Sequence, residues 1–419
     1  MIKRLTVIAL AVFLALGSSC DKPSNGGVDV PPPPPDSGQE QNGNQNGNGN
    51  GNENTDPGTD PGTDPGTTGT LCTDIGQTPI VLTYFTEYNE EIPDPTIVTH
   101  INYAHGRFGN PSTGDGGIVI TESKKAPLSK VVALKEQNPK LKVMLMIGGW
   151  GGHADGFSMM ARDPAKRTAF CLAVKAHIDN HKLDGVDIDW EYPTQSADNE
   201  TGCDPSDTKN FNLVLKELRE TIGTDKIISF ASSSSAKYVD WKTAMKYLDY
   251  VNVMTYDMGA APNGHNSPLH KSSMFNQRSW DESIDAHVKG GVPKNRQVMG
   301  IPCYGKSKKN PSDSEKIFDY SVKFYEIKDI LEKGLYKNKP LARPVTRKWE
   351  ATSMVPYLVD ASGVNVLSYD DPESVTAKGE YIKKDGELGA MFWEYRYDDS
   401  NRSLIKAVVK ALYGKDTIL

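Results

Sequence analysis

Eight short apolar segments alternate with helical patterns over most of this 419-residue chain, and this alternation constrains the fold more than any other feature. We predict strands at residues 80–85, 98–103, 142–147, 185–190, 227–232, 250–254, 297–302 and 389–393. Strands that alternate with helices form parallel sheets, and eight such units in roughly 340 residues are typical of a closed (β/α)8, or TIM, barrel. A doubly wound sheet is the structural alternative, but its glycine fingerprint is missing. The sequence therefore predicts an α/β fold with a TIM barrel over residues 77–415.

The segments between the predicted strands carry helix signals. One buried helix face is indicated by four apolar residues at i, i+3, i+4 and i+7 spacing, namely Phe211, Val214, Leu215 and Leu218. Asp163 and Asp371 each precede a proline, a pair that is typical of an N-cap followed by the first helical residue. We therefore expect helices to begin at these two positions.

Residues 183–193 have the sequence L-D-G-V-D-I-D-W-E-Y-P and contain three acidic residues spaced by two. Alternate side chains of a strand share a face, so Asp187, Asp189 and Glu191 would lie on one face, about 6.6 Å apart. The other face carries the apolar side chains of Val186, Ile188 and Trp190. Because that face must pack against other elements, we expect the acidic face to be partly enclosed. Enclosure and mutual repulsion raise carboxyl pKa values, and acids with separated pKa values are typical of acid–base catalysis.

The acidic row could instead be a strand edge in solvent, but three acids on one face at the end of an apolar strand count against that role. It could also be a magnesium site, because carboxylate clusters bind hard cations. No phosphate-binding glycine loop accompanies the row, so catalysis is the preferred hypothesis.

The row resembles the D-G-x-D-x-D-x-E signature of the family 18 glycoside hydrolases, the chitinases and their relatives, with every fixed position present from Asp184 to Glu191. The resemblance implies that Glu191 is the general acid and then the general base. It implies that Asp189 orients the substrate's 2-acetamido group, and that Asp187 shares a proton with Asp189. The sugar's own acetamide oxygen is then the nucleophile, the substrate-assisted scheme of this family.

Further motifs of the family end other predicted strands. Gly148-Gly149-Trp150 resembles S-x-G-G-W, with Met146 in the position of the serine that normally bonds to the first aspartate. Tyr84, at the end of the first strand, matches the other partner of that aspartate. Trp150 is an expected sugar platform, although a tryptophan taken singly is more often a core residue.

The sixth, seventh and eighth strands end in matching motifs. Met254-Thr255-Tyr256-Asp257 resembles M-x-Y-D, which implies that Tyr256 donates to the acetamide oxygen and that Met254 and Asp257 contact the sugar. Tyr304 lies in a segment that resembles G-x-P-x-Y-G, and Trp393 matches the tryptophan beneath the sugar. Sugar rings pack their apolar faces on such aromatic planes, so these residues are expected to bind substrate.

About seventy residues separate the seventh strand from the helix predicted after Pro372, more than a barrel connection needs. A helix is predicted at residues 324–332, and strand-like pieces lie at 355–359 and 365–369. Chitinases often carry a small α+β insertion at this point. We therefore expect residues 306–371 to form an inserted module that makes one wall of the cleft.

The first 76 residues are not expected to belong to the barrel. Residues 1–19 resemble a bacterial lipoprotein signal peptide, with Cys20 as the lipidated residue; an ordinary secretory signal is the alternative. Residues 20–76 are rich in Pro, Gly, Asn and Asp and are expected to be a disordered tether. These features predict a lipid-anchored protein of the bacterial cell envelope, on the outer membrane and facing either the periplasm or the surface, with no other membrane contact.

Charge and the remaining residue types limit the partners. The net charge of -7 does not favour nucleic acid, and the eight histidines show no metal-binding spacing, so we expect no metal and no cofactor. Four cysteines besides Cys20, at positions 72, 171, 203 and 303, permit either disulfides or buried thiols.

These expectations combine into a monomeric, exported enzyme that hydrolyses β-1,4-linked N-acetylglucosamine polymers, chitin or chitooligosaccharides, with retention. The nearest enzymatic alternative is an endo-β-N-acetylglucosaminidase that acts on N-glycans. The alternative from another class is a surface glycan-binding protein without catalysis. Such proteins typically lack the final glutamate of the row, which is present here as Glu191.

Overall fold

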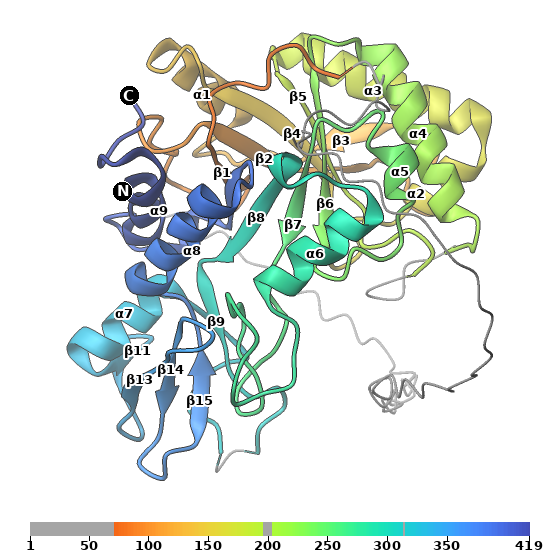
Figure 1. Cartoon of the computed structure of the whole chain (residues 1–419). Coiled ribbons are helices and arrows are strands. Elements are labelled where there is room, and N and C mark those ends of the chain that lie inside the picture. Colours follow the sequence, from red (N-terminus) through yellow and green to blue (C-terminus); the bar gives the residue numbers. More distant parts are fainter. Residues whose placement is uncertain (1–70, 196–202, 313–314) are drawn as a thin grey trace, which may run out of the picture. The chain divides into compact units, whose positions relative to one another are not determined.

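The computed structural model describes residues 71–195, 203–312 and 315–419, and its central element is a closed barrel of eight parallel strands (Figure 1). The barrel strands are β1 (Ile80–Thr86), β2 (His100–Phe108), β4 (Lys142–Gly148), β5 (Gly185–Asp189), β6 (Ile227–Ser233), β7 (Tyr250–Met254), β8 (Gln297–Pro302) and β16 (Gly389–Trp393). Each strand pairs with its neighbour in chain order, and β16 pairs with both β8 and β1, which closes the ring. The predicted TIM barrel is confirmed.

The alternation of side chains along each strand explains why the ring closes. In β1, Ile80, Leu82 and Tyr84 point into the barrel and pack there with Met144 and Met146 of β4. The intervening side chains point outward into a second, larger apolar cluster that includes the surrounding helices. Because both faces of every strand are covered, apolar side chains predominate on both faces of the strands.

Helices follow the strands and surround them in Figure 1. They are α1 (Leu128–Val132), η1 (Ala133–Glu136), α2 (Phe157–Arg162), α3 (Pro164–His181), α4 (Asp207–Ile222), α5 (Trp241–Ala244), α6 (Trp280–Gly290), η2 (Lys294–Arg296), α8 (Pro372–Asp385), η3 (Tyr395–Tyr397) and α9 (Ser403–Tyr413). The predicted caps are confirmed, because Asp163 accepts from the backbone at the start of α3 and Asp371 does so at the start of α8. The predicted apolar face of α4 is fully buried. No helix in the described ranges is both long and apolar enough to cross a membrane.

The second strand is where the prediction from sequence departs most from the structure. We predicted residues 98–103, whereas β2 begins at His100 and continues to Phe108. Its last three residues pair antiparallel with the short strand β3 (Ile118–Ile120), beyond the end of the parallel pairing with β1. The extension of β2 therefore depends on its pairing with β3, which the local sequence of β2 does not predict.

The insertion after the seventh barrel strand is confirmed and begins slightly earlier than predicted. It consists of β9 (Tyr304–Lys306), β10 (Ser321–Lys323), α7 (Phe324–Lys333), β11 (Leu335–Tyr336), β12 (Lys339–Pro340), β13 (Thr346–Glu350), β14 (Val355–Val359) and β15 (Asn365–Ser368). Five of these strands form an antiparallel sheet in the order β10-β9-β15-β14-β13. They pack with α7 around a separate small core that includes Phe318, Leu358 and Leu367.

Candidate active site

The carboxyl ends of the barrel strands open into a cavity of about 750 Å³. Except for Asp187, every residue that was predicted to be catalytic or to bind substrate lines this cavity. These residues are Tyr84, Trp150, Asp189, Glu191, Met254, Tyr256, Asp257, Tyr304 and Trp393. They come from six barrel strands and the segments that follow them. The barrel thus brings together residues that are up to about 300 positions apart in the sequence.

Asp187 lies beside the cavity, fully buried inside the barrel. Its carboxylate accepts hydrogen bonds from Tyr84 Oη at 2.8 Å, Ser229 Oγ at 2.6 Å and Asn252 Nδ2 at 3.0 Å. Burial raises the pKa of Asp187 to about 6, while these hydrogen bonds act in the opposite direction because they favour the charged form. Met146, which is in register with Asp187 on the neighbouring strand, offers no donor.

The sequence predicted Tyr84 as a partner of Asp187 but missed Ser229 and Asn252. Both lie on strands that were predicted correctly, β6 and β7, at positions facing the barrel interior. A polar residue at an inward position of a buried strand was the available signal, since such a group must find a partner.

Asp189 is the next residue of the row and is almost completely buried. Burial raises its pKa well above the usual range, and the charges of Glu191 and Asp187 add to that effect. Within the described part of the chain, no group forms a hydrogen bond with Oδ1 of Asp189. This oxygen is itself buried, while the Asp189 residue as a whole lines the cavity.

The Gly-Gly pair of the predicted motif lets β4 and β5 approach closely at this point. The Gly149 N–H donates to the Asp189 carbonyl at 2.8 Å. A Cβ atom on Gly148 would lie only 2.1 Å from that carbonyl oxygen, and Gly148 has a φ of +102°. Both features exclude a side chain at Gly148, so the glycine keeps the backbone of Asp189 against the end of β4.

Glu191 lies two residues beyond the end of β5 and is also largely enclosed. Burial raises its pKa to about 7, the negative charge of Asp257 acts in the same direction, and a hydrogen bond with Tyr192 opposes them. Near neutral pH this carboxyl group therefore exists in protonated and ionised forms in comparable amounts. That is the property that a group needs in order first to give and then to take a proton.

Two tyrosines and Asp257 form the opposite side of the cavity. Burial, followed by the charges of Asp189 and Glu191, raises the pKa of Tyr256 well above its usual value, so its phenol stays protonated and able to donate. Asp257 accepts a hydrogen bond from Tyr304 Oη at 2.8 Å and lies 3.1 Å from Lys306 Nζ. The ion pair and the hydrogen bond fix the direction of the Asp257 carboxylate.

Aromatic rings provide the apolar surfaces of the cavity. Trp150 is 57% exposed, which is unusual for a tryptophan and leaves its ring free to contact a ligand. The Trp393 ring packs against Tyr84 with 5.3 Å between centroids. Trp190 has the opposite environment: it is fully buried behind the acidic row, stacked on Phe157 with 5.3 Å between centroids.

The cavity contains further residues that the sequence did not single out. They are Tyr192, Ala231, Ser233, Ser234, Lys306, Lys309, Tyr320, Ser321 and Tyr397. Several belong to the insertion, so the insertion contributes one side of the cavity. No periodic pattern marked the insertion residues among them, because their place depends on how the insertion packs on the barrel.

The expectations for residues 1–70 lie outside the described residues, and these include the signal peptide, the lipidation of Cys20 and most of the tether. Of the other cysteines, Cys171 and Cys303 are free buried thiols.

A TIM barrel with a row of carboxyl groups and aromatic platforms at its strand ends is an arrangement suited to a glycoside hydrolase. Residues 80–398 match the sequence model of the glycosyl hydrolases family 18, and the chain belongs to this family. The match covers most of the barrel and the whole insertion.

Individual relatives agree with this assignment. The chain is 28% identical to Chitinase A1 of Niallia circulans over an alignment of 404 positions, which covers 79% of this chain and 57% of that protein. It thus spans less than two thirds of this relative's length. The solved structure of Ostrinia furnacalis Group IV chitinase in complex with allosamidin has a TM-score of 0.69 at 25% identity, covering 80% of this chain and 99% of that chain. A family 18 N-acetylglucosaminidase from Paenibacillus barengoltzii has a TM-score of 0.66 at 27% identity, with coverage of 80% and 99%.

Proposed function

We propose that this enzyme hydrolyses β-1,4-linked N-acetylglucosamine polymers, chitin or chitooligosaccharides, with retention of configuration. The observation that carries the proposal is the row of Asp187, Asp189 and Glu191, of which Asp189 and Glu191 line a cavity with aromatic sides. The three pKa values are shifted upward. Aromatic faces suit neutral sugar rings, and the carboxyl groups suit glycosidic bond cleavage.

Glu191 is the proton donor in this proposal. It lies at the cavity surface, and its pKa of about 7 keeps a large fraction of the carboxyl protonated near neutral pH. The proton passes to the glycosidic oxygen as the bond to the anomeric carbon breaks. The resulting carboxylate then takes a proton from the water that completes hydrolysis.

Asp189 acts on the substrate's 2-acetamido group. Its carboxyl group, which lines the cavity, accepts the acetamide N–H, which directs the acetamide oxygen toward the anomeric carbon, where a covalent bond forms in place of the glycosidic bond. The oxazolinium ion formed in this way is positive, and a nearby carboxylate stabilises it. Asp187, held by three donors, shares a proton with Asp189, so that the buried pair carries a smaller net charge.

Tyr256 and Asp257 orient the same sugar. The protonated phenol of Tyr256 donates to the acetamide oxygen, and Asp257 accepts from sugar hydroxyl groups. Met254, Tyr304, Trp150 and Trp393 provide the contact surface around them. The chitinase names of the relatives support the polymer as substrate, but the N-acetylglucosaminidase of known structure has the same fold, so the length of the substrate needs a direct test.

The experiment compares two substrates. The purified enzyme is incubated with a short N-acetylglucosamine oligomer and with a high-mannose N-glycan, and the products are identified by mass. NMR of the first product gives its anomeric configuration. Cleavage of the oligomer to a β-anomer supports the proposal. Cleavage of the N-glycan alone would replace it with an endo-β-N-acetylglucosaminidase, and binding without cleavage would replace it with a glycan-binding protein.

We also propose that Cys20 is lipid-modified and anchors the enzyme in the bacterial cell envelope, with residues 21–70 as a tether. The tether was predicted to extend to residue 76, but the Cys72 N–H donates to Asp249 Oδ1 at 2.6 Å and the Thr73 N–H donates to the Thr224 carbonyl at 2.9 Å, so residues 72–76 are held against the barrel. The support is the apolar run that ends in Gly17-Ser18-Ser19 directly before Cys20. Cys20→Ala should move the full-length protein from the membrane fraction to the soluble fraction of the host cell. If the variant remains in the membrane fraction, the proposal of a lipid anchor at Cys20 is wrong.

A further inference from the structure

A buried segment of the loop between β7 and α6, residues 265–267, contacts the catalytic strand end on one side and the insertion on the other. His265 and Asn266 are fully buried and Ser267 is 2% exposed. None of the three lines the cavity. All three are polar, so their burial requires partners, and those partners define what the segment does.

Asn266 holds the backbone next to Tyr256 and the backbone of Tyr304. Its Oδ1 accepts from the Asp257 N–H at 2.9 Å, and its Nδ2 donates to the Tyr304 carbonyl at 2.9 Å. Asp257 has a φ of +57°, a conformation that a non-glycine residue adopts only when its surroundings hold it there. The Asn266 side chain supplies one of the contacts that hold it.

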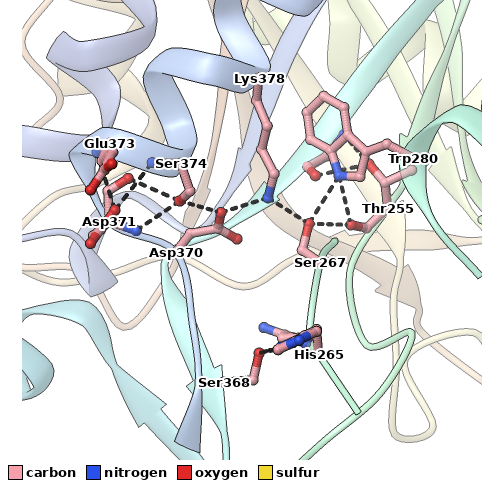
Figure 2. A network of polar contacts seen from close by, with 12 residues as sticks. Thr255, His265, Ser267, Trp280, Ser368, Asp370, Asp371, Glu373, Ser374 and Lys378 are labelled. Carbon is pink, nitrogen blue, oxygen red and sulfur yellow. Dashed lines mark hydrogen bonds and ion pairs between the residues drawn. The ribbon is translucent and has the colours of Figure 1, made fainter. Parts of the chain in front are cut away.

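Ser267 holds the backbone on the other side of Tyr256. Its Oγ donates to the Thr255 carbonyl at 2.6 Å and accepts from Trp280 Nε1 at 2.9 Å and from Lys378 Nζ at 2.9 Å (Figure 2). Trp280 Nε1 lies 3.1 Å from the same Thr255 carbonyl. The peptide groups before and after Tyr256 are therefore both fixed by adjacent residues of one buried segment.

The segment is in turn held by the insertion and by α8. Lys378 forms an ion pair with Asp370 at 2.6 Å, and both side chains are buried (Figure 2). His265 Nε2 lies 2.6 Å from Glu350 Oε2 of β13, and the Asn266 N–H donates to Ser368 Oγ of β15 at 2.9 Å. The insertion thus reaches the catalytic strand end through this buried contact as well as through the cavity wall.

We propose that Asn266 is a positioning residue for the reaction: through the backbone of Asp257 and Tyr304 it sets where the Tyr256 phenol and the Asp257 carboxylate lie relative to the sugar. This role rests on the proposed function, because it assigns Tyr256 to the acetamide oxygen. The phenol must be aligned in the transition state, and a displacement of about 1 Å at a catalytic group can cost about 10²-fold in rate.

The test compares Asn266→Ala with Asn138→Ala in the otherwise unchanged protein. Asn138 is also a buried asparagine with two backbone bonds, to the Pro95 carbonyl at 2.9 Å and from the Lys140 N–H at 3.1 Å, but these partners do not line the cavity, whereas the partners of Asn266 do. Both variants should lose stability to a similar extent. Asn266→Ala alone should lower kcat about 10–100-fold while KM for a long oligomer changes less than about threefold.

A second measurement separates positioning from general loosening of the fold. A thiazoline analogue of the oxazolinium ion should inhibit Asn266→Ala less strongly than the wild type, by the factor lost in kcat/KM. It should inhibit Asn138→Ala like the wild type. If Asn266→Ala does not fold, Ser267→Ala is measured in its place, and the same split between kcat and KM is expected.

The outcomes are distinct. No cleavage of any N-acetylglucosamine oligomer by the wild type overturns the proposed function and this role with it. Cleavage by the wild type, together with equal kcat and equal inhibition for Asn266→Ala and Asn138→Ala, overturns the positioning role alone.

Discussion

Glu191→Gln tests the central assignment, because glutamine keeps the shape of the side chain and removes its proton. Burial raises the pKa of Glu191 from an ordinary 4.5 to about 7. At pH 7 about half of the carboxyl groups are then protonated, against about 0.3% for an ordinary glutamate. The enclosure by the barrel thus increases the concentration of the acid by about two orders of magnitude at neutral pH. Without that acid, turnover should fall by about 10²–10⁴-fold.

The raised pKa of Glu191 also predicts on which side of neutral pH the enzyme loses activity. A general acid must be protonated, and the pKa of Glu191 is raised, so activity should be present below pH 7 and lost as the pH rises through about 7. Well above that pH, kcat/KM on an N-acetylglucosamine oligomer should fall about tenfold per pH unit. Glu191→Gln should lose this alkaline limb together with the rate. The assay is the initial rate of product formation between pH 5 and pH 9, followed by mass spectrometry.

Glu387 provides the matched control. Its pKa is raised to about 8, by burial first and then by Asp385, and it lies just before β16, at the opposite end of the barrel from the cavity. Glu387→Gln should leave both kcat and the alkaline limb unchanged. Near-normal turnover by Glu191→Gln on an unactivated oligomer would refute the assignment of the proton donor. An alkaline limb that persists in Glu191→Gln and disappears in Glu387→Gln would refute the reasoning from the pKa.

Four further substitutions test other parts of the site and its surroundings. In the proposed mechanism Asp189 acts as a carboxylate, so the Asp187–Asp189 pair must lose a proton and activity should also fall at low pH. Ser229→Ala removes a donor that lowers the pKa of Asp187, so this acidic limb of kcat/KM should move to higher pH; a limb that stays in place would contradict this. Trp190→Ala should cost about 3–5 kcal/mol of unfolding free energy in urea titrations, because the side chain is fully buried. Trp150→Ala should cost less than about 0.5 kcal/mol and weaken oligomer binding instead, since the side chain is 57% exposed. Tyr320→Ala removes an aromatic ring that the insertion contributes to the cavity, so KM should rise more for a hexamer of N-acetylglucosamine than for a dimer. Equal changes in KM would contradict the prediction that the insertion forms a wall of the substrate cleft.

The barrel could be predicted from the sequence because its signals are local. Every barrel strand except β2 was predicted to begin and end within one residue of its observed bounds, and two of the helix starts were marked by Asp163 and Asp371. Strand β2 differs because its end pairs with β3, a contact made after the chain has turned back. Local patterns predict elements, whereas the partner of an element's last residues depends on the assembled fold.

The acidic row and the aromatic ends of the strands could be predicted for the same reason, since each is a short motif. The groups that support them could not. Asn252 reaches Asp187 from two strands away, and Asn266 reaches Asp257 from a loop whose sequence shows no periodic pattern. Lys306 was assigned only to the insertion, yet its ammonium group is paired with Asp257 in the cavity. These contacts follow from the closure of the barrel and the packing of the insertion.

Met146 shows how a closed barrel can compensate for a changed motif residue. An inward carboxylate on β5 has neighbours on both sides, and Asp187 is in register with Met146 on β4 and with Ser229 on β6. The family resemblance places a donor on the β4 side, where Met146 has none. The Ser229 hydroxyl donates from the β6 side at 2.6 Å, and Tyr84 donates from across the barrel at 2.8 Å. Since a buried carboxylate needs donors but not a particular strand to supply them, Met146 is no argument for a glycan-binding protein that has lost catalysis.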